Sequence, residues 1–326
     1  MERALVTAIG SFAADIVIRN LKKAGFYVVG CDIYDEKWVA ESLETDEFYK
    51  APYAVEESTY IGFLTELCRD EKISYLLPLT DAEVDVLNRH REAFEKIDTV
   101  LCLSSEKAVR LCRDKIQLEE YIRKAQICGT IPSMKLAETM ERYKTAEDLP
   151  WTQVVLKPYN GRSSSGLYRV YDKRKLPFYL GLIDNVDEYV IQPLIDGTVI
   201  TVDVVRDGSG NTAAVPRREL LRTLNGAGTS VEVFRDEKLE DLCRKIAEIL
   251  DIKGCVNFEF IEEKGTEKQY FMECNPRFSG GAAFSCEAGY DMVTNHIRVF
   301  QGREIEKENR SVPQYIARKY QEYMMH

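Results

Sequence analysis

The chain contains 326 residues, of which 45% are hydrophobic and 30% are charged, a composition typical of a soluble globular protein of about two domains. Its formal net charge of −10 argues against a general nucleic-acid or acidic-membrane binder, because such a protein needs a basic face. The apolar runs are far shorter than the roughly 20 residues that cross a bilayer, and the N-terminus lacks the pattern of a secretory signal. We therefore expect a cytoplasmic protein with no membrane-spanning segment.

Cysteine and histidine usage excludes several chemistries. Nine cysteines, an odd number, are spread along the chain without a CxxC pair, which predicts reduced core residues in a cytosolic protein. The three histidines, His90, His296 and His326, have the spacing of neither metal ligands nor a catalytic triad. Zinc hydrolysis and Ser-His chemistry are therefore excluded.

The first hundred residues alternate strand-like and helix-like segments, which predicts a parallel sheet with crossover helices. The expected strands cover residues 4–9, 27–33, 74–79 and 99–103, and the first helix covers residues 12–24. The turn after the first strand holds only Gly10, so the GxGxxG fingerprint of dinucleotide binding is absent. Asp32 does end the second strand, where dinucleotide-binding folds often have a ribose-binding acid, but without the glycines a packing role is favoured.

A helix is predicted between Ser104 and Gly129, with Ser105 as its N-cap, and a domain boundary near its start. Short strands and one helix are expected up to about residue 185. Longer strands and hairpins follow to about residue 275, and then a helical tail.

The most informative stretch is an alternating pair of strands, 254–261 and 269–275, which predicts a hairpin. If Glu259 lies opposite Glu273, the turn is centred on Thr266 and Asn257 faces Asn275. Residues two apart share a face, so these two glutamates and two asparagines project from one side. The other side then carries Val256, Phe258, Phe260, Met272 and Cys274.

Two carboxylates and two carboxamides on one face favour a bound Mg²⁺ or Mn²⁺, because like charges directly opposite each other are otherwise unfavourable. A solvated sheet face is the alternative. Residues Arg277, Ser279, Gly280 and Gly281 follow directly and add a fixed cation, a hydroxyl group and room for close backbone approach. A transferred phosphoryl group needs such surroundings.

The run Glu-x-Asn-Pro-Arg-Phe-Ser-Gly-Gly at residues 273–281 closely resembles the metal-binding signature of the ATP-grasp superfamily, in the subgroup similar to the large chain of carbamoyl-phosphate synthase. The resemblance implies an α/β protein with a parallel-sheet N-terminal domain over residues 1–104. An ATP-grasp fold would follow over residues 105–326, with two α+β subdomains gripping ATP and a small lid at about 130–190. It also implies ATP and Mg²⁺ or Mn²⁺ as cofactors, with the metal held by Glu259, Glu273 and Asn275.

The same resemblance assigns residues to the nucleotide. Lys115, in the segment Arg113–Lys115, and Lys157, at the end of an apolar strand, would contact the phosphates. Without the resemblance, a lysine at this position is more often a solvated surface charge. The loop that would cover ATP contributes Ser163, Ser164, Ser165 and Gly166, and it lacks the spacing and the lysine of a P-loop. An ordinary hairpin loop is the alternative.

The segment Tyr189–Gly197 resembles the interdomain linker that holds adenine. Gln192 lies in this linker, Pro193 would offer its carbonyl group to the adenine amino group, and Ile195 its N–H to the ring. Val199 occupies a position where many members have a ribose-binding glutamate, which leaves Asp196 or Asp203 to compensate.

Further residues are assigned to the substrate side. Strand alternation directs either Arg217 or Arg218 into the cleft, where it would clamp an anion, while the other points away. The loop after the strand at 74–79 lies where ligands bind in open α/β sheets. The expected substrate contacts are Thr80, Asp81, Glu83, Arg217, Arg218, Ser279, Gly280 and Gly281.

The resemblance implies an ATP-dependent ligase in which Lys157 and Arg277 are the catalytic residues. A substrate carboxylate would be activated as an acylphosphate and joined to an amine, with release of ADP and phosphate. The expected partners are therefore small-molecule carboxylates and amines, with neither nucleic acid nor membrane, and a homodimer is left open. An ATP-dependent phosphotransferase and a non-catalytic nucleotide-binding regulator are the alternatives.

Overall fold

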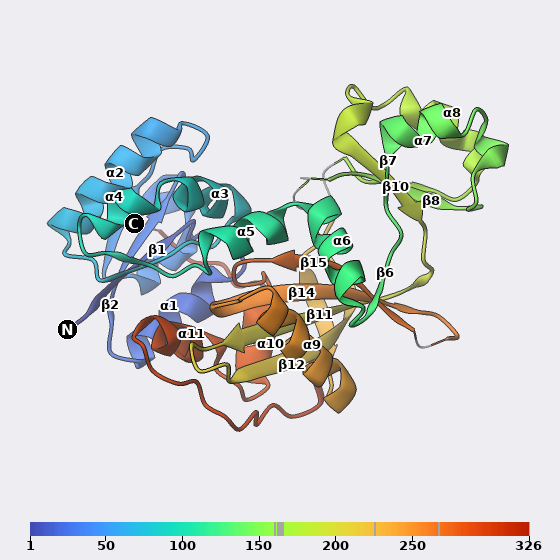
Figure 1. Ribbon diagram of the computed structural model, residues 1–326. Coiled ribbons are helices and arrows are strands. Elements are labelled where there is room, and N and C mark those ends of the chain that lie inside the picture. Colours follow the sequence, from blue (N-terminus) through green and yellow to red (C-terminus); the bar gives the residue numbers. More distant parts are fainter. Residues whose placement is uncertain (160, 162–165, 225, 267, 326) are drawn as a thin grey trace.

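The computed structural model describes residues 1–159, 161, 166–224, 226–266 and 268–325. Three sheets organise this part of the chain, each with helices packed on it (Figure 1). Among the described helices, none is long and apolar enough to cross a membrane.

The first sheet is parallel and has the strand order β3-β2-β1-β4-β5. Its strands are β1 (Arg3–Thr7), β2 (Tyr27–Asp32), β3 (Glu47–Lys50), β4 (Tyr75–Leu77) and β5 (Val100–Leu101). Its helices are α1 (Ala14–Lys23), α2 (Glu57–Asp70), α3 (Asp81–Arg89) and α4 (Arg91–Glu95). The predicted parallel α/β architecture is confirmed. The short edge strand β3 was not predicted, because two of its four residues are exposed and it carries no buried apolar run.

The prediction of a single helix between residues 104 and 129 is wrong, because the structure has two helices there. Helix α5 (Glu106–Arg113) ends at Asp114, whose backbone is extended at φ −101° and ψ 100°. The Asp114 carboxylate then accepts hydrogen bonds from the N–H groups of Ile116 and Gln117 and caps α6 (Lys115–Ala125). The break places Lys115 at the first position of a new helix.

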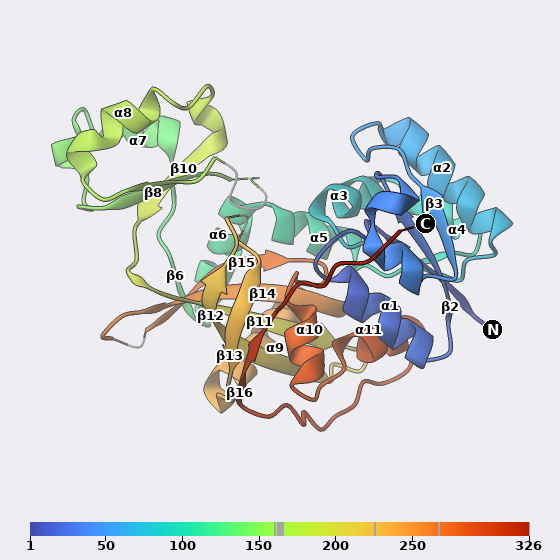
Figure 2. The same cartoon turned by 180° about the vertical axis from the view of Figure 1, so that it is seen from behind.

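The second sheet is a small antiparallel unit that projects away from the rest of the molecule (Figures 1 and 2). Its order is β7 (Met134–Lys135), β10 (Tyr189–Pro193), β8 (Val154–Pro158) and β9 (Tyr168–Val170). Two helices, α7 (Leu136–Arg142) and α8 (Leu176–Leu180), cover it, whereas one was expected. A separate hydrophobic core fills this unit, with Leu136, Leu156 and Ile191 fully buried.

The third sheet has seven strands in the order β16-β13-β12-β11-β14-β15-β6. These are β6 (Gly129–Thr130), β11 (Gly197–Arg206), β12 (Thr212–Arg222), β13 (Gly228–Val233), β14 (Gly254–Glu263), β15 (Gln269–Asn275) and β16 (Gln314–Ala317). Helix α9 (Glu237–Ile249) packs on one face, and α10 (Ala282–Glu287) and α11 (Met292–Phe300) lie after the last hairpin. The predicted helical tail is thus incomplete, because the chain returns as β16 and pairs with β13.

The predicted register of the hairpin β14–β15 is confirmed near the glutamates and wrong beyond them. Asn257 pairs with Asn275 and Glu259 with Glu273, but Phe260 then pairs with Phe271. Met272 is the extra residue of a β-bulge. The bulge turns Phe271 into the core beside Phe258 and Phe260, whereas Met272 moves to the opposite face from the one predicted.

Candidate active site

A cavity of about 950 Å³ lies where the three sheets meet. Twelve of its lining residues come from the predicted catalytic, metal, phosphate-binding and substrate residues and three from the adenine linker. These are Thr80, Asp81, Lys115, Lys157, Gln192, Pro193, Ile195, Arg217, Glu259, Glu273, Asn275, Arg277, Ser279, Gly280 and Gly281. Ser163, Ser164 and Ser165 lie outside the described residues. Gly166 is described, with φ +70°, and a Cβ atom there would lie 2.5 Å from the Tyr189 hydroxyl oxygen, but it does not line the cavity.

Glu259 and Glu273 face each other across the hairpin and are both largely buried. Burial, together with the charge of Glu273, raises the pKa of Glu259 to about 6. Burial would also raise the pKa of Glu273, but the cations of Lys115 and Lys157 outweigh it and hold that pKa below its usual value. The pair thus carries unfavourable repulsion that a divalent cation would relieve.

The side chain of Asn275 completes an oxygen-rich set. Its Nδ2 donates to Asn257 Oδ1 (3.1 Å) and to Glu273 Oε1 (3.3 Å), which leaves its own Oδ1 available. Within the described ranges, no group of three or more His, Cys, Asp or Glu side chains is arranged as a metal site. The donor set therefore consists of two carboxylates and one carboxamide, which fits a hard cation such as Mg²⁺.

Two lysines lie beside this carboxylate pair. Lys115 Nζ lies 3.3 Å from Glu273 Oε2 and donates to the carbonyl oxygen of Gly161 (2.9 Å). Lys157, on β8, is buried, and desolvation lowers its pKa to about 8 even though Glu273 and Glu259 favour the charged form. None of the described residues forms an ion pair with the Lys157 ammonium group, so this cation is available to an anionic ligand.

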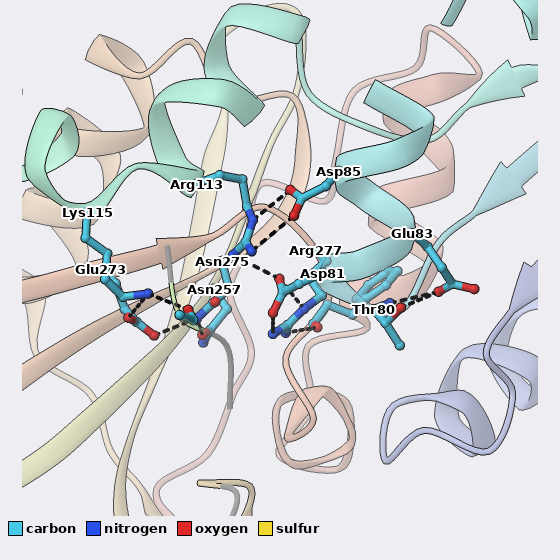
Figure 3. Close-up of polar contacts among 12 residues, drawn as sticks. Thr80, Asp81, Glu83, Asp85, Arg113, Lys115, Asn257, Glu273, Asn275 and Arg277 are labelled. Atoms are coloured by element: carbon cyan, nitrogen blue, oxygen red, sulfur yellow. Dashed lines mark hydrogen bonds and ion pairs between the residues drawn. The ribbon is translucent and has the colours of Figure 1, made fainter. Parts of the chain in front are cut away.

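Arg277 is held by a carboxylate from the first sheet's side of the cavity (Figure 3). Its Nε and Nη2 donate to the two oxygens of Asp81, at 2.9 and 2.8 Å. Arg113 lies 3.5 Å from Asp81 and donates to Asp85 (2.8 Å). Burial would raise the pKa of Asp81, but Arg277 and Arg113 hold it below the usual value. Asp81 and Arg277 are therefore already neutralised by each other, although both line the cavity.

Glu83, predicted as a substrate contact, does not line the cavity. It forms a capping box with Thr80 at the start of α3, and its Oε1 accepts a hydrogen bond from the Tyr60 hydroxyl (2.9 Å). This carboxylate is fully engaged in closing the helix N-terminus and is buried. Thr80 remains at the cavity wall.

Strand alternation separates the two neighbouring arginines as predicted. Arg217 points into the cavity and is 1% exposed, while Arg218 lies on the other face, where it pairs with Glu262 and Glu232 and stacks on Phe234. Arg218 is therefore not a site residue. Arg217 donates to Asp203 (2.7 Å), to Ser279 (3.0 Å) and to Glu219 (3.3 Å).

Asp203 was expected near the ribose, but the structure places it beneath Arg217. It is completely buried, its Oδ2 accepts hydrogen bonds from Arg217 and from the Ser285 hydroxyl (2.6 Å), and it does not line the cavity. Asp203 lies on β11 opposite Val215, and no part of its side chain is exposed. Val199 and Asp196 do line the cavity.

Several cavity residues were missed by the sequence reasoning. Glu219 lies two residues after Arg217 on the same strand, so alternation alone could have found it. Met272 could not have been found, because only the bulge brings it to this face. Arg222, which lies 3.5 Å from Glu259, and Phe12, next to the turn at Gly10, have no distinguishing motif.

Comparison with protein families gives two matches. Residues 5–102 match the family described as "PylC-like, N-terminal domain". Residues 185–322 match the family described as "ATP-grasp in the biosynthetic pathway with Ter operon".

Among known proteins, the chain is 22% identical over 279 residues to the carbamoyl phosphate synthase large chain of Clostridium acetobutylicum, covering 82% of this chain and 26% of that relative. It is 25% identical over 210 residues to the same protein of Clostridium perfringens, covering 61% and 19%. The chain thus spans about a quarter of the relatives' length or less.

Two solved structures illustrate the similarity of fold. One is the biotin carboxylase domain of the Hydrogenobacter thermophilus 2-oxoglutarate carboxylase, a dimer in complex with MgADP, ADP and bicarbonate. It aligns with a TM-score of 0.80 and 19% identity, over 96% of this chain and 73% of that chain. N5-carboxyaminoimidazole synthetase from Staphylococcus aureus, complexed with ADP, aligns with a TM-score of 0.76 and 17% identity over 96% and 81%.

Proposed function

We propose that this chain, which has the ATP-grasp fold behind a PylC-like N-terminal domain, is an ATP-dependent ligase that joins a carboxylate to an amine. The observation that carries the proposal is the arrangement of Glu259 and Glu273, which face each other on β14–β15 beside Lys115 and Lys157 in one cavity. Paired carboxylates next to two lysines suit a metal-bound polyphosphate. The ADP complexes of both structural neighbours support the same ligand.

Mg²⁺, or Mn²⁺ in its place, would be held by Glu259, Glu273 and Asn275. When bound, the metal would supply neutralisation of the phosphate charge. Lys115 and Lys157 would contact the phosphates from the helix and lid sides, and the linker residues Pro193 and Ile195 would contact adenine. The phosphate end then lies toward Arg217 and Ser279, where the cavity extends to the first sheet.

The reaction follows from this placement. A substrate carboxylate would attack the terminal phosphorus to form an acylphosphate and ADP, and an amine would then displace phosphate. The chain needs no side-chain nucleophile for these steps, because positioning and electrostatic stabilisation supply most of the catalysis in such transfers. We propose Lys157 as the catalytic cation, and Arg277 as a catalytic or anchoring cation that Asp81 holds in place.

The relatives named above are much longer than this chain, so their complete activity is not transferred to it. We propose only small-molecule acid and amine substrates. A homodimer remains a proposal as well, supported by the dimeric form of the Hydrogenobacter thermophilus domain.

The test is a screen of the twenty amino acids, singly and in pairs, with ATP and Mg²⁺. Nucleotide chromatography should show ADP, mass spectrometry should show a condensed product, and ¹⁸O from a labelled carboxylate should appear in phosphate. AMP as the product, or unlabelled phosphate, would contradict the acylphosphate mechanism. A phosphorylated acid that never incorporates the amine would instead indicate a phosphotransferase, and binding of ATP without turnover a regulator.

A further inference from the structure

We propose that one end of the cavity is a subsite for the ammonium group of the amine substrate, with the Glu219 carboxylate as the group that recognises it. The inference rests on the proposed ligase function and specifies the class of its second substrate. That class is a primary amine that binds in its protonated form and passes one proton to the Glu219 carboxylate before its neutral nitrogen attacks the acylphosphate carbon.

Glu219 has an oxygen without a partner in a buried place. It lies on β12, shares a face with Arg217 and lines the cavity, and its side chain is only 3% exposed. Oε1 accepts a hydrogen bond from Arg217 Nε (3.3 Å), whereas Oε2 is buried and has no hydrogen-bond partner among the described residues. Since a buried carboxylate oxygen without a donor is costly, a donor from a ligand is expected there.

Two glycines make room for the side chains of Glu219 and Arg217. A Cβ atom on Gly228 would overlap Glu219 Oε2, and a Cβ atom on Gly281 would lie 2.6 Å from Arg217 Nη2. Any larger residue at either position would force the carboxylate or the guanidinium to move. The absence of a side chain at Gly228 and Gly281 therefore allows both charged groups to hold their positions.

The two carboxylates beside Arg217 outnumber the guanidinium that pairs with them. Arg217 lies between Asp203 and Glu219, so these three side chains carry a net charge of −1. Two further cations lie nearby and keep their charge, but in the described part of the chain neither forms an ion pair with Glu219. Arg222 points to Glu259 and to the Gly226 carbonyl oxygen, and Arg318 donates to the carbonyl oxygens of Phe12 and Gly280.

A second unpartnered polar atom lies on the same sheet face, in a hydroxyl group that can accept a hydrogen bond from a ligand. Thr201 lines the cavity, pairs with Arg217 across the sheet, and its Oγ1 is buried without a partner in the described part of the chain. A primary ammonium group offers three N–H donors, which matches a carboxylate and a hydroxyl oxygen. Mg²⁺ requires near-octahedral oxygen coordination, which a single free carboxylate oxygen beside a guanidinium does not supply.

The first test does not depend on turnover. Crystals of the full chain with a non-hydrolysable ATP analogue and Mg²⁺ would be soaked in thallium(I) acetate, since Tl⁺ is a monovalent cation of ammonium-like size with an anomalous signal. We expect an anomalous peak in contact with Glu219 Oε2, retained in Glu232→Gln and lost in Glu219→Gln. Glu232 is the matched control because it lies on β13 and pairs with Arg218 on the other face. No peak at Glu219, or Mg²⁺ bound there instead, would overturn the proposal.

The second test uses the acid found in the amino-acid screen. In Glu219→Gln, the KM for the cationic amine should rise at least about tenfold, because a charge-assisted hydrogen bond is lost. Hydroxylamine, which is neutral at pH 7.5, should still be converted to the hydroxamate within about twofold of the wild-type rate. An unchanged KM for the amine, or an equal loss with hydroxylamine, would overturn the assignment. If the wild-type protein formed neither ADP nor hydroxamate, the ligase function would fail while the thallium result would still stand.

Discussion

Asp81 accepts two hydrogen bonds from the guanidinium group of Arg277, although 196 residues separate them in the chain. Asp81 begins helix α3 beside the first sheet, and Arg277 follows the last strand of the hairpin that carries the two glutamates. This ion pair therefore ties the N-terminal sheet to the carboxylate pair of the cavity (Figure 3). It is also the reason that neither residue is free to act as an independent charge.

Replacing this carboxylate should destabilise the protein. Asp81→Asn leaves Arg277 and Arg113 without their shared counter-charge in a buried place, and we expect a loss of about 1.5–3 kcal/mol in the free energy of unfolding. Urea unfolding would measure it. The same substitution at Asp241, an exposed partner of Arg244 and Lys245, serves as the control and should change little. Equal losses of unfolding free energy in the two variants would show that the Asp81–Arg277 pair does not stabilise the fold.

Removing one of the two carboxylates that we propose as metal ligands should abolish most turnover. Glu273→Gln takes away an anionic ligand and the partner of Lys115, so we expect turnover to fall by on the order of a hundredfold or more. Steady-state ADP release at ordinary Mg²⁺ concentrations checks this. Glu237→Gln, on the exposed first turn of α9, is the matched control. Near wild-type activity of Glu273→Gln would exclude the metal assignment.

Lys157→Met should weaken ATP binding much more than Cys274→Ala does. The lysine would make charge-assisted contacts with phosphate worth roughly 1.5–3 kcal/mol, which is about ten- to a hundredfold in affinity. Cys274 lies on β15, on the face of the β14–β15 hairpin opposite the two glutamates, and it is buried in the core. Its truncation should therefore reduce stability instead. Calorimetric titration of ATP into both folded variants distinguishes the two effects. Equal affinities would mean that Lys157 does not contact the nucleotide.

A buried histidine should make stability depend on pH. His296 Nδ1 accepts a hydrogen bond from the Cys255 N–H (2.8 Å), and burial lowers its pKa from 6.5 to about 3. The unfolded chain therefore binds a proton below pH 6.5 that the folded chain binds only near pH 3, and stability falls as the pH decreases through this window. Above pH 6.5 the histidine is neutral in both the folded and the unfolded chain, so this loss of stability is absent there.

The variant His296→Asn measures this contribution, because its amide oxygen can accept the same hydrogen bond without titrating. Between pH 7 and pH 5, the wild-type protein should lose roughly 2 kcal/mol more free energy of unfolding than the variant. Chemical unfolding at both pH values provides the comparison. Parallel pH profiles for the two proteins would show that His296 is not the titrating group.

Local patterns in the sequence determined much of this protein, because they depend on residues a few positions apart. The hypothesis that Glu259 lies opposite Glu273 placed Asn257 opposite Asn275, and alternation predicted that Arg217 and Arg218 point to opposite faces; the structure has all three arrangements. Alternating strands and helices likewise predicted the parallel N-terminal sheet. These features follow from strand geometry and apolar burial, which act over short distances along the chain.

Only the tertiary structure decided which polar groups meet. The bulge at Met272 depends on Phe271 packing against Phe258 and Phe260. Asp81 reaches Arg277, and Asp203 lies beneath Arg217, through pairings between segments far apart in sequence. Such contacts follow from how whole elements pack, and no local pattern encodes which charge will find which partner.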